Sequence, residues 1–108
     1  MIILNCTPHE VKIVDETGDI QFVFKTSGTI PRVTSTDEQV GEIEGIGVPL
    51  IRQKFGEVTD LPERKEDTIL IVSAMVKAAK PDRDDLVSPA QFVRDDKGQI
   101  IGCKALAY

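Results

Sequence analysis

Hydrophobic and polar residues alternate along much of the chain, and this alternation predicts strands rather than helices. Residues 20–25 show it most clearly, because large apolar side chains occupy every second position. We therefore expect one face of this strand to lie in the core. Apolar runs at 2–6 and 11–14 predict two further strands near the start of the chain.

Glycine-containing turns separate these apolar runs. The turns at 16–19 and 95–98 predict hairpins, because each holds a glycine that can adopt a positive φ, and residues 26–29 form another turn. Residues 40–44 and 48–53 flank the Gly-Ile-Gly sequence at 45–47, which predicts another hairpin with a short turn.

The chain between 30 and 67 contains one further strand and one long connection. Residues 30–36 are rich in β-branched side chains, and Pro31 places this strand at a sheet edge or makes Pro31 one of its first residues. Residues 54–67 carry a glycine, a proline and mixed charges. They are expected to form the longest irregular connection, either a binding loop or a plain surface crossover.

A buried strand that runs into a short helix is predicted in the second half. Residues 68–72 form an unbroken aliphatic and β-branched run, which fits a strand buried on both faces. Ser73 is a candidate N-cap for a helix over 74–80, with Met75 and Ala79 on one side, and Pro81 ends it. The unpaired amides at this joint are suited to binding an anion. Leu86 and Val87 follow, before another proline-containing turn.

Together these elements predict an α+β fold, a β-rich single domain over residues 1–108. Its short antiparallel strands would form a meander or a barrel-like sheet with one short helix. A chain of 108 residues fits one domain, and 41% hydrophobic with 29% charged residues is ordinary for a globular protein.

Charge and hydropathy exclude several partners. The net charge of −5 is spread over both halves, and no basic patch interleaved with aromatic residues is present, which argues against a nucleic-acid polymer as partner. No apolar run approaches the roughly 20 residues of a membrane helix, and the N-terminus lacks the basic start of a signal peptide. We expect a cytoplasmic protein without a membrane partner.

The sequence predicts no metal and no cofactor. Cys6 and Cys103 are expected to be buried free thiols, with a disulfide only in an oxidising compartment. Two cysteines and one histidine do not complete a four-ligand zinc site without carboxylates. The acidic run at 82–85 could hold a divalent cation, but Arg83 lies within it, and the glycine and distal glutamate of a calcium loop are missing.

Candidate chemistry lies in the turns and strand ends. Residues 7–10 read Thr-Pro-His-Glu, a capping-box pattern that predicts a single helical turn. His9, the only histidine, either serves this turn or contacts a ligand, or acts as an acid or base with Glu10 orienting it. Arg32 and Arg83 are the better candidates for a phosphate, which a guanidinium binds through two parallel hydrogen bonds. Ser73 is expected to be a cap or an anion donor rather than a nucleophile.

Several segments together resemble a family of small phage and prophage proteins of uncharacterised function, whose members share a Leu-Asn-Leu-Thr-Pro-His opening and a late Arg-Asp-Asp segment. The resemblance spans nearly the whole chain, and Cys6 stands where the family opening has leucine. The matching segments are Leu4-Asn5-Cys6-Thr7-Pro8-His9, Gly56-Glu57-Val58 with Leu61-Pro62, Ile71-Val72-Ser73, Arg83-Asp84-Asp85, and Val93-Arg94-Asp95 with Gly98 and Ile101-Gly102.

The resemblance implies a phage context, in which small proteins of this size include counter-defence proteins that sequester nucleotide signals of host immunity. We therefore expect a binding protein for a small phosphate-containing nucleotide, a cyclic nucleotide or an ADP-ribose derivative. The alternatives are a hydrolase of the same ligand that uses His9, and a structural or protein-binding phage component. The pocket could lie at the subunit interface of a homo-oligomer. The expected ligand-binding residues are Asn5, Thr7, His9, Ser27, Arg32, Ser73, Arg83 and Asp84.

Overall fold

Eight strands and one short helix make up the computed structural model, which describes residues 1–108. The predicted β-rich α+β fold with a single short helix is confirmed. In chain order the elements are β1 (Ile2–Asn5), β2 (Val11–Val14), β3 (Ile20–Phe24), β4 (Arg32–Ile43), β5 (Val48–Thr59), β6 (Thr68–Ile71), α1 (Ala74–Ala79), β7 (Leu86–Arg94) and β8 (Ile100–Ala107).

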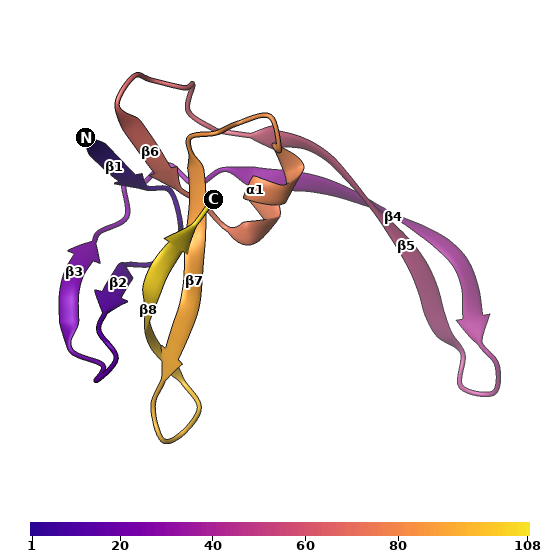
Figure 1. Ribbon diagram of the computed structural model, residues 1–108. Coiled ribbons are helices and arrows are strands. Elements are labelled where there is room, and N and C mark those ends of the chain that lie inside the picture. Colours follow the sequence, from indigo (N-terminus) through magenta and orange to yellow (C-terminus); the bar gives the residue numbers. More distant parts are fainter.

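Six strands form the sheet of the protein body, in the order β1-β6-β7-β8-β2-β3. The hairpins β2–β3 and β7–β8 are antiparallel as expected, whereas β1–β6, β6–β7 and β2–β8 are parallel pairs. The two outer strands meet at one end, because Asn5 at the end of β1 forms a bridge with Thr26, two residues after β3. The sheet therefore curls toward a barrel (Figure 1).

The core consists of two small clusters on opposite sides of β6. Leu70 and Val72 belong to the cluster that also contains Val76 of α1, and Ile71 belongs to the cluster that contains Cys103. Successive residues of a strand point to opposite faces, so one apolar run supplies both clusters. The prediction that this strand is buried on both faces is confirmed.

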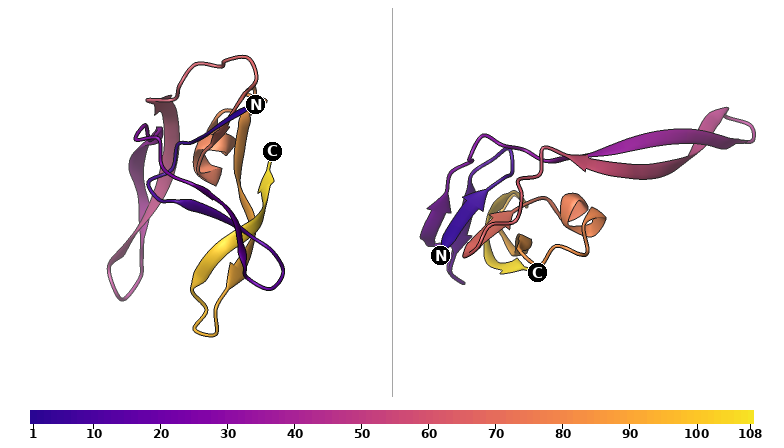
Figure 2. Two further views of the ribbon diagram at one scale, coloured as in Figure 1. Left: turned by 90° about the vertical axis from the view of Figure 1, so that its left-hand side faces the viewer. Right: turned by 90° about the horizontal axis from the view of Figure 1, so that it is seen from above.

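Strands β4 and β5 form a separate two-stranded sheet, which we call the arm, together with their connecting turn. Figures 1 and 2 show the arm leaving the body and extending well beyond it. The radius of gyration is 17.3 Å, compared with about 13 Å for a compact domain of this length. The arm is therefore the feature that makes this molecule elongated, with principal extents of 51 × 39 × 21 Å.

The arm corrects the prediction for residues 54–67. Residues 54–59 continue strand β5 and pair with β4, so only the part after Thr59 is an irregular connection. Gly56 suggested that the strand ends before it, but the glycine lies within β5 and allows close packing against β4. A Cβ atom at this position would lie 2.6 Å from Oγ1 of Thr34, which lies at a β-bulge of β4. The strand is exposed on nearly all its residues, which is why no alternating pattern marked it.

Two smaller predictions about strands are also wrong. Ile20 and Phe22 do not lie in the core; Phe22 is 64% exposed, because β3 is an edge strand and only Phe24 packs against the buried residues. Pro89 does not form a turn but lies within β7, opposite Leu106 of β8. At this point β7 has passed the end of its pairing with β6, so the missing N–H of proline interrupts no ladder on that side.

Helix α1 begins as the sequence predicts. The hydroxyl oxygen of Ser73 accepts a hydrogen bond from the amide of Val76 at 3.2 Å, so Ser73 is the N-cap. The buried residue of the helix is Val76, whereas Met75 is exposed on the side facing the arm. This helix lacks the length and apolar content needed to cross a bilayer.

The buried side chain of Asn5 joins the two outer strands of the curled sheet. Its Nδ2 donates to the carbonyl oxygens of His9 and Phe24, both at 2.8 Å. Its Oδ1 accepts from the amide and the hydroxyl of Thr7, at 3.0 and 2.6 Å. Residues 7–9 thus form a bend that the Asn5 side chain orders through its hydrogen bonds to Thr7 and His9, and the predicted helical turn over 7–10 is wrong.

We expect Asn5→Asp to lower the free energy of unfolding by about 3 kcal/mol. The change keeps the acceptor but replaces the donor with an oxygen that faces two carbonyl oxygens at a site only 2% exposed. The matched control is Asp15→Asn, the converse change in an exposed turn where Asp15 accepts from the amide and hydroxyl of Thr17. Urea unfolding followed by circular dichroism measures both. A loss below about 1 kcal/mol for Asn5→Asp would contradict the role given to Asn5.

Candidate functional site

A cavity of about 340 Å³ lies where the end of β1, the start of β4 and the start of α1 meet. We call it the Arg32 cavity. It brings together three of the predicted ligand-binding residues, Thr7, Arg32 and Ser73, which come from distant parts of the chain. Its lining residues are Cys6, Thr7, Pro8, Ile30, Pro31, Arg32, Val33, Ser73, Met75 and Val76.

The parallel pairing of β1 and β6 explains why Thr7 and Ser73 are neighbours. Asn5 pairs with Ile71, so both strands end at the same edge of the sheet and the residues that follow them lie side by side. The amide of Cys6 also donates to the carbonyl oxygen of Ile71 at 2.8 Å. Carboxyl ends of neighbouring parallel strands are where ligands commonly bind in sheets with such pairs.

Arg32 and Ser73 are the donors of this cavity that remain available to a ligand. The Arg32 guanidinium makes no hydrogen bond and no ion pair with any residue of the chain; only its carbonyl is engaged, by Thr59. Ser73 accepts from the helix amide through its oxygen, which leaves its hydroxyl hydrogen free to donate. The Thr7 hydroxyl is already engaged by Asn5, so Thr7 shapes the wall.

An apolar groove of about 430 Å³ adjoins the Arg32 cavity. It lies between α1 and the base of the arm, and all of its lining residues are apolar. Val33 and Met75 line both spaces, so the cationic cavity and the apolar groove are neighbours. The remaining lining residues of the groove are Phe55, Ala74, Ala78 and Ala79. A molecule with an anionic end and an apolar end would match this pair of spaces.

Cys6 lies in the wall of the Arg32 cavity as a thiol. Burial raises the pKa of Cys6, and a contact of 3.8 Å with the Ser27 hydroxyl opposes this rise only in part. Burial raises the pKa of Cys103 as well. Both cysteines are free and lie in different core clusters. Protonated buried thiols are poor nucleophiles, so neither cysteine is suited to covalent chemistry.

Arg83 lies elsewhere, beyond the C-terminal end of α1, and its guanidinium is occupied. It forms two hydrogen bonds of 2.8 Å with the carboxylate of Asp85 and one of 3.0 Å with the carbonyl of Pro62. The side chains of Arg83 and Asp85 are only 15% and 5% exposed. In this conformation Arg83 anchors the connection before β6 to the one before β7.

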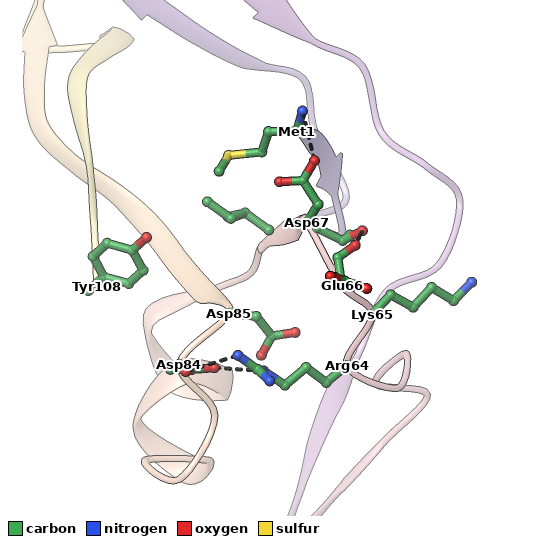
Figure 3. Close-up of a pocket in the computed structure, with 10 residues that line it drawn as sticks. Met1, Arg64, Lys65, Glu66, Asp67, Asp84, Asp85 and Tyr108 are labelled. Atoms are coloured by element: carbon green, nitrogen blue, oxygen red, sulfur yellow. Dashed lines mark hydrogen bonds and ion pairs between the residues drawn. The ribbon is translucent and has the colours of Figure 1, made fainter.

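Asp84 lines an open cavity of about 510 Å³ between the chain termini and residues 64–69 (Figure 3). Its carboxylate receives two hydrogen bonds from Arg64, at 2.7 and 3.0 Å, in an exposed ion pair. Although Glu66, Asp67 and Asp85 also line this cavity, no three acidic, cysteine or histidine side chains of the chain are placed to hold a metal ion together.

The other predicted site residues surround the Arg32 cavity without lining it. Asn5 is buried and holds the loop, and the amide of Ser27 donates to the carbonyl oxygen of Asn5 at 2.8 Å. The His9 side chain is exposed and forms no hydrogen bond; only its carbonyl oxygen is used. The ligand-binding role of all eight residues stays a prediction.

The residues of the apolar groove were missed by sequence reasoning. The sequence placed Met75 and Ala79 on one side of the helix, and this was the only indication of the groove; nothing in the sequence indicated that the arm would face that side.

Comparison with protein-family models, curated proteins and solved structures finds no match to this chain.

The buried Arg83–Asp85 pair should make stability depend on pH in the acid range. Hydrogen bonds from Arg83 lower the pKa of Asp85, so the pair stabilises the fold above about pH 4, the ordinary range of an aspartate, and this contribution is lost as the pH falls through the lowered value. At pH 7 we expect Asp85→Asn to cost about 2–3 kcal/mol, because it leaves the Arg83 charge buried without its partner.

The matched control for this pair is Asp84→Asn, which breaks the exposed pair with Arg64 and should cost less than about 1 kcal/mol. Urea unfolding at pH 7 and pH 2 measures both variants. The difference between the wild type and Asp85→Asn should narrow at pH 2; a difference that is the same at both pH values would contradict the stabilising role of the ionised Asp85.

Proposed function

We propose that this chain is a binding protein that captures a small nucleotide signal, such as a cyclic nucleotide or an ADP-ribose derivative, and sequesters it. The observation that carries the proposal is Arg32, an exposed residue that lines the cavity beside an apolar groove and whose guanidinium has no carboxylate partner. An unpaired guanidinium in a concave site favours a phosphate or another oxyanion.

The two adjoining spaces suit the two ends of a nucleotide. A phosphate would lie against Arg32, and the Ser73 hydroxyl would donate to the phosphate or to a ribose oxygen. The planar base would lie in the groove, against Met75 and Phe55, where apolar and aromatic contacts are available. Cavities of about 340 and 430 Å³ are in the range of small-molecule sites.

Sequestration, rather than transport or sensing, is supported by the resemblance to small phage proteins. A phage protein that binds a host immune signal tightly lowers its free concentration in proportion to the number of copies present. A hydrolase of the same ligand is the rival. It would use His9, which lies on the exposed loop next to Thr7 and Pro8 of the cavity wall.

The first test is a thermal-shift panel of cyclic dinucleotides, cyclic mononucleotides and ADP-ribose derivatives. A ligand present at about 100 times its dissociation constant stabilises the folded state by about 2.7 kcal/mol, a shift of several degrees for a domain of this size. The bound compound is then released by heat and analysed by chromatography. Intact compound supports sequestration, and altered compound supports the hydrolase. A panel without any shift would contradict nucleotide binding.

Arg32→Gln should weaken the binding of any compound found in this way by about 10- to 100-fold, the effect of losing one charge-assisted hydrogen bond or a pair of them. Arg94→Gln is the matched control, since it removes the same charge near the β7–β8 turn, where Arg94 only donates to the carbonyl of Gly98. Isothermal titration calorimetry measures both variants. Equal affinities for wild type and Arg32→Gln would place the ligand elsewhere.

A further inference from the structure

The arm of one isolated copy of the chain has little to stabilise it in water. Its two strands, each of 12 residues, pair only with each other, so each has one unpaired edge. An isolated two-stranded hairpin is at best marginally stable in water, and long open edges invite pairing with another chain. In Figures 1 and 2 only the base of the arm lies near the body, and its outer half projects away from it.

The outer half of the arm exposes a group of apolar side chains. Val48 and Leu50 share one face of β5, and Ile43 lies on the same face because it pairs with Val48. Gly41 lies opposite Leu50, and no atom of the chain lies within 4 Å of the position that a Cβ would occupy, so a second chain has room to approach there. We call the exposed apolar residues of this face the arm patch: Ile43, Val48 and Leu50. Val40, Ile46 and Ile51 are exposed as well but lie at the register shift, in the turn and on the other face.

The accessible surface area of the molecule is larger than that of a compact protein of the same mass. Its accessible surface is 7721 Å², which is about 1,800 Å² more than the area expected for a compact monomer of 11.9 kDa. A stable interface buries about 800 Å² on each partner. The excess surface therefore exceeds what one subunit contributes to a stable dimer.

The charges of the arm complement those of a second arm. On the face of the arm patch, β4 carries Glu38, which lies opposite Arg52 of β5 and forms an exposed ion pair of 3.9 Å with Lys54 of the same arm. If a second arm packs with its β4 over the first β5, its Glu38 faces Arg52. A two-fold axis along the arms repeats the same match for the other pair of strands.

We propose that the arm is a self-association surface, through which two copies of this chain form a two-fold symmetric dimer. The arm patch of each copy covers that of the other, with the two arm tips at the same end. Formation of the dimer does not require a ligand, so the proposed dimer and the proposed nucleotide binding are tested independently of each other. A partner of a different sequence would leave the purified protein monomeric.

Sedimentation equilibrium of the purified wild type tests the proposal. We expect twice the protomer mass of 11.9 kDa at micromolar concentration. Leu50→Glu should raise the dissociation constant of the dimer at least tenfold. The matched control is Ile20→Glu, which places the same charge at an exposed apolar position of β3 in the body, and it should leave the dimer unchanged. A monomeric wild type, or a larger effect of Ile20→Glu than of Leu50→Glu, would overturn the proposal.

Hydrogen exchange of the wild type gives a second test that does not depend on a variant that folds. The amides of residues 37–53 should become at least tenfold better protected when the protein concentration is raised through the dissociation constant, because the arm is stabilised only in the dimer. The amides of β6 should not change with concentration, since they lie in the core of each copy. Arm amides whose protection is independent of concentration would also overturn the proposal.

Discussion

The four hydrogen bonds of the Asn5 amide are the contacts on which the rest of the body depends. A curled sheet must close where its outer strands meet, and its unpaired backbone groups must find partners there without water. Asn5 satisfies carbonyl groups from the loop after β1 and from β3, and it orders Thr7 with its own oxygen. Because Thr7 and Pro8 then form a wall of the Arg32 cavity, one buried amide shapes both the fold and the candidate site.

The two arginines singled out in the sequence show how packing separates structural from functional groups. Arg83 and Arg32 have the same chemistry, and both were expected to meet phosphate. Arg83 is enclosed with Asp85 and the Pro62 carbonyl, so its donors are consumed within the protein. Arg32 starts the arm at the mouth of a cavity and keeps its donors free. An anion-binding role therefore fits Arg32 far better than Arg83.

The arm separates exposed apolar side chains from the buried residues of the body. Only 15 of 108 residues are buried, and those lie in the body. Val33 and Val58 at the base of the arm pack against the core, but the apolar side chains of its outer half are exposed in one isolated copy. A chain that exposes such side chains on both strands of a projecting hairpin gains stability mainly from whatever covers them. The base of the arm also forms one side of the apolar groove through Val33 and Phe55, which connects the position of the arm to the candidate site.

Local rules were enough to determine the hairpin turns, the strand–helix joint at Ser73 and the strand over 68–71 that is buried on both faces, because these features depend on neighbours in sequence. The fold class followed from the same periodicity. Only the tertiary structure decided which strands are parallel neighbours, and hence that Thr7, Arg32 and Ser73 share a cavity while Arg83 and Asp84 lie apart. The length of the arm was also decided there, since an exposed strand has no apolar alternation and its hydrogen-bond partners are distant in sequence.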